Sequence, residues 1–160
     1  MVFATAVRLL GNPTDAEDAA QTVFLRAFQR YAQLAASPAV AGWLRTTTRN
    51  VCLNHLTRYR ARWRFFSELP GEGGAPFKDA LAARVSLALD TERAQRSERL
   101  EQAVWLLPDH QRVPLVLFHF EELSYQEIAS TLGVSLGKVK TDIHRGREAL
   151  RRLLAGDDAA

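Results

Sequence analysis

The sequence has little cysteine: one residue, Cys52, in a chain of 160. A single thiol cannot form an internal disulfide and cannot supply a metal centre with several thiolate ligands, so both kinds of site are excluded. Low cysteine usage fits a reducing compartment. We expect Cys52 to be a small buried apolar residue, and we expect no metal and no cofactor.

Long apolar runs are also missing. No stretch approaches the roughly 18 apolar residues that a membrane-spanning helix needs. The N-terminus shows no basic leader followed by an apolar core and a cleavage site. The sequence therefore predicts a cytoplasmic protein without membrane segments. Apolar residues make up 47% of the chain, which is enough for a core and argues against wholesale disorder.

Recognisable catalytic motifs are absent as well. We find no phosphate-binding loop, no zinc-ligand spacing, and no serine or cysteine nucleophile with a plausible base. His55 has no partner at a useful spacing in the sequence, so it is interpreted as a residue at the edge of the core. We predict that the protein is not an enzyme and has no catalytic residues.

Acidic residues are missing between Asp18 and Glu68, where eight arginines lie. Residues 1–69 carry nine Lys/Arg against four Asp/Glu, a net charge of +5, whereas residues 70–107 and 108–160 each carry −1. A segment of one sign attracts polyanions such as nucleic acid. The alternative is a basic helix face that only contacts solvent.

Alternating strand patterns are absent, and nearly every periodic segment predicts a helix. A first helix is expected to end at Gly11-Asn12-Pro13. Thr14 is expected to begin the second helix, with Glu17 completing a capping box. The three-and-four spacing of its apolar residues predicts a buried face, made of Ala20, Val23, Phe24, Ala27, Phe28 and Tyr31.

A longer helix is predicted from about Val40 to about Arg64, after a start signal at Ser37-Pro38. Residues 69–76 contain three glycines and two prolines, which predicts the start of a linker, and 77–90 predict a weak helix. A firmer helical pattern runs from near Thr91 to Leu107. The short helix after it contains Pro114, which predicts a bend or a late helix start.

Residues 124–152 have the pattern of a helix-turn-helix. Ser124 and Glu127 can cap the first helix, Gly133 permits a left-handed turn, and Ser135 can cap the second helix. The alternative is an ordinary helical hairpin with a glycine turn. Asp142 stands out among basic neighbours, and we expect it to pair with a nearby arginine or to discriminate among bases. The outward residues of the second helix are predicted to be Lys138, Lys140, Thr141, His144, Arg145 and Arg147.

With these patterns the chain resembles the sigma factors of bacterial RNA polymerase, in particular the extracytoplasmic-function group. The resemblance covers nearly the whole sequence and is carried by two separated motifs, Asp15–Phe28 with Trp43–Val51, and Leu107–Arg112 with Tyr125–Ala129 and Gly137–Arg147. It implies an all-α fold with two small helical domains joined by a flexible linker. We expect a region 2-like domain at 1–68, a linker at 69–92 and a region 4-like helix-turn-helix domain at 93–155. The family has a longer opening helix than the one that begins at Met1.

The resemblance also implies roles for particular residues. The first domain is expected to bind the largest polymerase subunit through Asp18, Gln21 and Thr22. The loop Leu34–Pro38 and Asn50 correspond to the place where the family holds a base flipped out of the minus-ten DNA. Strand opening is expected to use Arg45, Arg49, Asn50, Arg58 and Arg60, and Arg62 and Arg64 can also follow the phosphates. For Trp43 we favour core packing over base stacking. Contacts with duplex DNA are expected from Ser135, Lys138, Lys140, Thr141, His144, Arg145 and Arg147.

The predicted partners are core RNA polymerase and promoter DNA, both duplex and single-stranded. Members of the group are often held by an anti-sigma factor, which is a candidate partner here. Lys138 stands where the family usually has threonine and Asp142 where it is often basic, so promoter preference is expected to differ. The alternative function is a stand-alone helix-turn-helix regulator. The C-terminal domain is poor in net charge, which predicts weak duplex binding on its own and favours the sigma factor.

Overall fold

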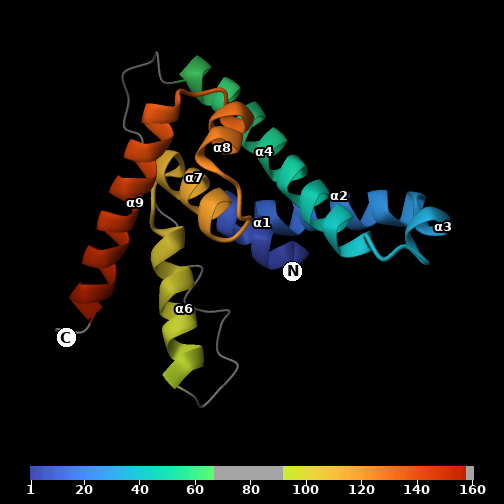
Figure 1. Ribbon diagram of the computed structural model, residues 1–160, viewed down its shortest axis with the longest axis horizontal. Coiled ribbons are helices and arrows are strands. Elements are labelled where there is room, and N and C mark those ends of the chain that lie inside the picture. The colour runs from blue at the N-terminus through green and yellow to red at the C-terminus, as the bar shows by residue number, and fades with distance from the viewer. Residues whose placement is uncertain (67–91, 158–160) are drawn as a thin grey trace.

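The computed structural model describes residues 1–66 and 92–157. Every regular element within those two stretches is a helix, as the sequence predicted (Figure 1). None of these helices is both long enough and apolar enough to cross a membrane. The predicted linker start at 69–76 and the predicted weak helix at 77–90 lie outside the described residues.

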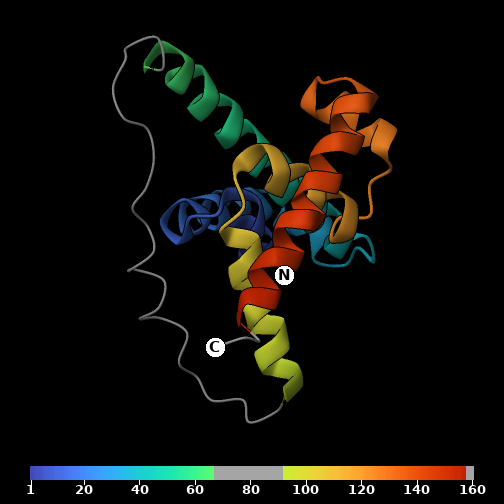
Figure 2. The ribbon, with the colours of Figure 1, turned by 90° about the vertical axis from the view of Figure 1, so that its left-hand side faces the viewer.

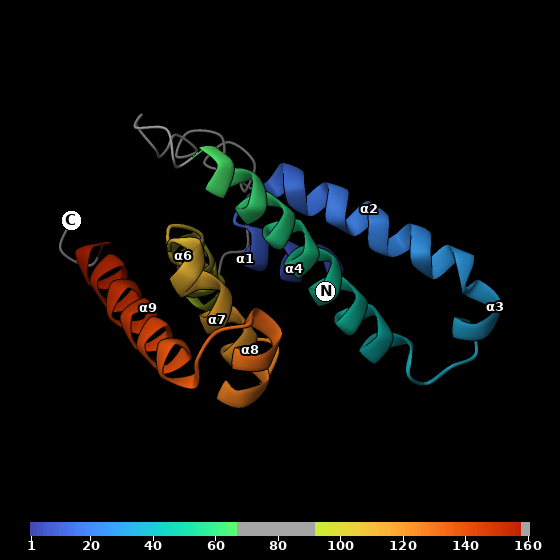
Figure 3. The same ribbon diagram turned by 90° about the horizontal axis from the view of Figure 1, so that it is seen from above.

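The first half consists of α1 (Val2–Leu10), α2 (Pro13–Gln29), α3 (Tyr31–Leu34) and α4 (Val40–Phe66). Helices α2 and α4 lie side by side and are connected through α3, and α1 packs against both of them (Figure 3). The predicted bounds of the long helix, about Val40 to Arg64, agree closely with α4. Cys52 of α4 is fully buried, as expected.

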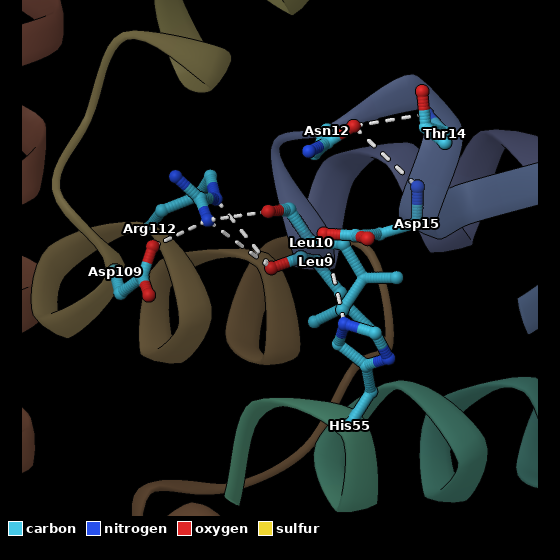
Figure 4. Close-up of polar contacts among 8 residues, drawn as sticks. All are labelled: Leu9, Leu10, Asn12, Thr14, Asp15, His55, Asp109 and Arg112. Carbon is cyan, nitrogen blue, oxygen red and sulfur yellow. Dashed lines mark hydrogen bonds and ion pairs between the residues drawn. The ribbon is translucent and has the colours of Figure 1, made fainter. Parts of the chain in front are cut away.

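The predicted N-cap of α2 is wrong. Asn12, not Thr14, caps this helix: its side-chain oxygen accepts hydrogen bonds from the backbone N–H groups of Thr14, at 2.9 Å, and Asp15, at 3.4 Å (Figure 4). Pro13 occupies the first helical turn, where its missing N–H costs nothing. The N-cap of α2 therefore lies two residues earlier than predicted.

The predicted buried face of α2 is correct only in its first part. Ala20 and Val23 are buried, but Phe24, Phe28 and Tyr31 are 56%, 77% and 68% exposed. Helix α2 extends past the short α1, so its later turns have no helix of the first half to cover this face (Figure 1). The apolar stripe therefore continues from core onto an open surface.

The second half consists of α6 (Glu92–Trp105), α7 (Asp109–His119), α8 (Tyr125–Leu132) and α9 (Leu136–Asp157). Helix α9 packs against α6, α7 and α8. Pro114 lies buried inside α7, so the predicted late start of this helix is wrong. A proline in the interior leaves one helical hydrogen bond unmade, and the tight packing of its neighbours must offset that loss.

The two halves share one continuous core, which the sequence did not predict. A single cluster of buried residues draws on α1, α2 and α4 as well as on α6, α7, α8 and α9. Helix α1 lies at the centre, because it contacts α7 and α6 in addition to its own half (Figure 2). Thus α1 connects the two halves in space.

Candidate nucleic-acid interface

Helices α8 and α9 form the predicted helix-turn-helix. The Ser124 hydroxyl accepts a hydrogen bond from the Glu127 backbone, while the Glu127 carboxylate accepts one from the Ser124 N–H at 2.8 Å, a complete capping box. The hydrogen bonds that the Ser124 N–H and the Ser124 hydroxyl donate to the Glu127 carboxylate hold the pKa of this carboxyl below its usual range. Gly133 has φ 64°, a left-handed conformation that side-chain-bearing residues adopt only with strain. Ser135 then caps α9 by accepting from the Lys138 N–H at 3.2 Å.

The packing side of the motif is also as predicted. Ile128, Val139 and Ile143 are buried, with no more than 1% of each residue exposed. Their burial turns the opposite side of α9 toward solvent. The residues on that side are all exposed, namely Lys138, Lys140, Thr141, His144, Arg145 and Arg147.

Two of these exposed cations already have partners. Lys138 Nζ lies 2.8 Å from Asp142 Oδ2, so the expected arginine partner of Asp142 is wrong. Lys138 lies one helical turn before Asp142, so the two side chains can meet on the same face of α9. The ion pair holds the buried Asp142 carboxylate in place. Arg147 donates its Nε–H to His119 Nε2 at 3.2 Å. Burial, and then the positive charge of Arg147, lower the pKa of His119.

The remaining outward residues form the available reading surface. Lys140, His144 and Arg145 have exposed side chains on α9 with no ion pair among the described residues. Thr141 donates its hydroxyl to the backbone oxygen of Gly137 at 3.0 Å, which keeps the side chain close to the helix. A helix presenting such groups from its first turns fits the major groove of DNA.

Helix α4 carries the arginines that were predicted to act in strand opening. Arg45 is exposed, Arg49 is half-buried, and Asn50 beside it is exposed. Arg45 and Arg49 lie one helical turn apart and so share a face. Arg58 and Arg60 belong to α4, but their side chains lie outside the described residues.

One buried carboxylate, Glu121 of the second half, lies close to these arginines. Burial raises its pKa, and the charges of Arg45, Arg49 and Arg8, with a hydrogen bond from Thr5, oppose that rise. Its Oε2 atom is buried and has no hydrogen-bond partner among the described residues. This contact was not predicted, because Glu121 is remote from the arginines along the chain.

Between α2 and α4 lies an open hollow of about 350 Å³ that sequence reasoning missed. The Arg30 guanidinium lies over the Trp43 ring, 5.9 Å from its centre. Trp43 is half-buried, so its expected core packing is incomplete. The only sequence signal was the cluster of arginines in the acid-free segment. The hollow is lined by Arg26, Gln29, Arg30, Trp43 and Thr47.

The predicted polymerase contacts lie together on α2. Asp18, Gln21 and Thr22 are all exposed, and the Thr22 hydroxyl donates to the Asp18 backbone oxygen at 2.9 Å. The exposed Phe24, Leu25 and Phe28 follow them on the same helix. The periodicity of the sequence could not distinguish these exposed apolar residues from buried core residues. We call these six residues the α2 surface.

His55 has the partner that its sequence neighbourhood lacked. Its Nε2 atom lies 3.6 Å from Asp15 Oδ2, which joins α4 to the start of α2 (Figure 4). The pair stabilises the packing of two helices at the edge of the core. Within the described residues, no group of three or more His, Cys, Asp and Glu side chains could hold a metal ion.

Comparison with known proteins gives matches over both halves. Residues 1–63 match the family model for sigma-70 region 2, and residues 97–150 match the model for sigma-70 region 4. The chain is 32% identical to the ECF RNA polymerase sigma factor SigW of Bacillus subtilis, over 96% of this chain and 82% of that protein. It is 38% identical to the ECF sigma factor SigE of Mycolicibacterium smegmatis, over 96% of this chain and 57% of that protein.

A solved structure has a similar arrangement of helices. It is the sigma factor RpoE in complex with the anti-sigma factor NepR from Bartonella quintana. The TM-score is 0.53 at 22% sequence identity, and the match covers 96% of this chain and 89% of that one. At this identity the likeness supports the fold.

Proposed function

The chain belongs to the sigma-70 family of RNA polymerase sigma factors, in the extracytoplasmic-function group, and we propose how its two halves divide the work of promoter recognition. As a sigma factor it directs RNA polymerase to promoters in transcription initiation, with core polymerase and promoter DNA as its partners. In our proposal the second half binds the minus-thirty-five duplex through α9. The first half binds and opens the minus-ten region through α4.

The surface of α9 supports the first part of the proposal. Lys140, His144 and Arg145 are exposed together on one helix, whose start is capped and pinned by the buried Val139 and Ile143. Groups of this kind can donate to base edges and phosphates in a major groove. Lys138 is held by Asp142, so we expect it to contribute less than the other cations.

The charges and the hollow of the first half support the second part. Arg45 and Arg49 can follow a phosphate backbone, and Asn50 can exchange hydrogen bonds with a base edge. The hollow lies between α2 and α4. Its lining combines the guanidinium groups of Arg26 and Arg30 with the aromatic ring of Trp43. A positive groove with an aromatic surface is the usual platform for single-stranded nucleic acid. We propose that one base and its phosphate occupy this region during strand opening.

The α2 surface is proposed to bind the polymerase. Exposed apolar residues bordered by polar ones are typical of protein interfaces. Phe24, Leu25 and Phe28 supply the apolar part, and Asp18, Gln21 and Thr22 the polar part. A few large side chains usually contribute most of the binding free energy of a protein interface, and Phe24 and Phe28 are candidates for this role.

Sigma factors are non-enzymatic initiation factors, and we propose that this chain likewise has no catalytic activity of its own. It works in the cytoplasm in this proposal, since polymerase and chromosome are found there. An anti-sigma factor is a further proposed partner, of the kind in complex with the similar solved structure. The stand-alone regulator is the less favoured function, because both halves match sigma-70 regions.

Transcription in vitro with core polymerase tests the division of labour. Asn50→Ala should impair strand opening more than initial promoter binding, and a template melted beforehand around the minus-ten region should restore much of its activity. The double change Lys140→Ala and Arg145→Ala should weaken promoter binding by about tenfold or more, since each lost phosphate or base contact costs of order 1 kcal/mol. That variant should open a bound, pre-melted template almost normally.

The matched control for the double variant is Arg151→Ala together with Arg152→Ala. These residues are exposed on the later part of α9, and the control removes the same two charges. It should bind nearly as the unchanged protein does. Equal loss of binding and opening in every variant would contradict a division of labour while leaving the family assignment in place.

A further inference from the structure

Asp142 is an acidic residue among the basic residues of α9, and its side chain is only 8% exposed. It lines a hollow of about 360 Å³ between α7 and the helix-turn-helix. Asp109 of α7 lines the same hollow and is already paired with Arg112. Lys138 is the one lysine or arginine among the described residues that line this hollow. The buried Asp142 carboxylate therefore depends on Lys138 for a permanently charged partner.

The spacing of residues along α9 gives Asp142 two possible cationic partners. Lys138 lies four positions before it and Arg145 lies three positions after it, and both spacings bring side chains together on one side of a helix. The structure joins Asp142 to Lys138, whose Nζ donates to Oδ2 at 2.8 Å. Arg145 stays exposed. The carboxylate thus holds the cation that leaves Arg145 available to DNA.

The stability of α9 alone does not explain this ion pair. A lysine in the first turn lies at the positive end of the helix dipole, and a lysine four positions before an acid is the less favourable order. A buried carboxylate that loses its cation is strongly unfavourable, so Asp142 without Lys138 should attract another positive group. Arg145 is the remaining lysine or arginine at a spacing of three or four positions from Asp142.

We propose that Lys138 is a positioning residue, which occupies the Asp142 carboxylate and thereby leaves the Arg145 guanidinium free to read DNA. The inference rests on the proposed binding of duplex DNA by α9, and it adds a residue that acts through another. Arginine reads a guanine by donating two hydrogen bonds to its base edge. A guanidinium that is bound to a carboxylate has already committed donors to that partner. Lys138 thus determines base preference at the position that Arg145 contacts.

The test measures base preference, because a change of charge alters the attraction to DNA of every sequence. The full chain in complex with core polymerase selects from a library of randomised duplexes, and the bound duplexes are sequenced. Arg145→Ala should lose about tenfold preference at one base pair, the discrimination expected of a good arginine contact. Lys138→Ala should lose preference at the same base pair. The double variant Lys138→Ala with Asp142→Ala should regain it.

Two controls separate this role from direct contact with DNA and from damage to the fold. Lys140 lies two positions after Lys138 and so points to another side of α9. The preference lost in Lys140→Ala should therefore not return when Asp142→Ala is added. In the Arg145→Ala chain, adding Lys138→Ala should cause no further loss of preference. A damaged α9 would instead lose the preferences of its other residues too, and thermal unfolding would show the damage.

A measurement without DNA separates the inference from the proposed function. In Lys138→Ala the Nε–H of Arg145, observed by NMR, should exchange with water more slowly than in the unchanged chain, because Asp142 then binds the guanidinium. Adding Asp142→Ala should remove this slowing. Unchanged exchange in Lys138→Ala would overturn the inference alone, as would a preference that the double variant does not regain. Slowed exchange with no change of base preference in any α9 variant would contradict the proposed function, and the inference with it.

Discussion

Charged residues that look alike in the sequence have different surroundings in the fold. Arg112 is 5% exposed and binds backbone oxygens of another helix, whereas Arg45 is exposed on α4. Burial lowers the pKa of Arg112, and Asp109 opposes this effect through its charge and a hydrogen bond. Charge counts therefore predicted the general attraction to nucleic acid but not which arginine is available to it.

The cysteine was predictable and its chemistry follows from its burial. Burial raises the pKa of the Cys52 thiol to about 12, and the charge of Glu121 acts in the same direction. A thiol with so high a pKa has almost no thiolate at neutral pH and reacts slowly. Cys52 thus acts as an apolar core residue.

Glu121 gives a test at the scale of one residue. Its pKa in the folded chain is raised above 4.5, so the ionised form costs folding free energy at neutral pH. This cost disappears as the pH falls through the raised pKa toward 4.5, because the folded chain then binds the proton more readily than the unfolded chain. Glu121→Gln removes the charge but keeps an oxygen for Thr5. Its unfolding midpoint should be about 2 °C higher or more at pH 7, with no gain near pH 4.

Glu122→Gln is the control for this measurement, because Glu122 is exposed and lies next in the chain. It should change the midpoint little at either pH. A Glu121→Gln midpoint that falls at pH 7 would mean that attraction to Arg8, Arg45 and Arg49 outweighs the cost of burial. The account of Glu121 would then be wrong.

At the scale of helices, local signals predicted most of the elements. The capping box of Ser124 and Glu127 and the left-handed Gly133 depend only on neighbouring residues, and both are confirmed. The cap of α2 was misplaced because Asn12 and Thr14 are both good caps, and Pro13 decides between them. The exposed end of the apolar face on α2 could not be predicted, because periodicity marks an apolar face without saying what covers it.

That face gives a prediction for α2. Phe28→Ala should weaken binding to core polymerase by about tenfold or more, the loss expected for an aromatic anchor. The free energy of unfolding should change by less than about 0.5 kcal/mol, because Phe28 is 77% exposed. Fluorescence anisotropy with labelled protein can measure the binding, and thermal unfolding the stability.

Phe3→Ala makes the same chemical change on α1, where Phe3 is 46% exposed. It should leave polymerase binding nearly unaltered. If the two variants bind alike, the α2 surface is not the docking surface, and the apolar face must serve another purpose.

At the scale of the whole molecule, the sequence predicted two helical bodies but not their contact. The composition break at 69–76 indicated a separation, and the family matches at 1–63 and 97–150 lie on either side of it. The bonds from Arg112 to Leu9 and Leu10 join residues about a hundred positions apart. No local pattern contains information of that kind. The domain bounds 1–68, 69–92 and 93–155 stay a prediction.

Run-off transcription with purified core polymerase tests the central claim most directly. Templates carrying a panel of promoters are transcribed with and without the chain, and the start sites are mapped. We expect the chain to bind the polymerase and to produce transcripts from specific start sites that core polymerase alone does not use. Failure to bind the polymerase, together with an unchanged set of start sites across the panel, would contradict the account.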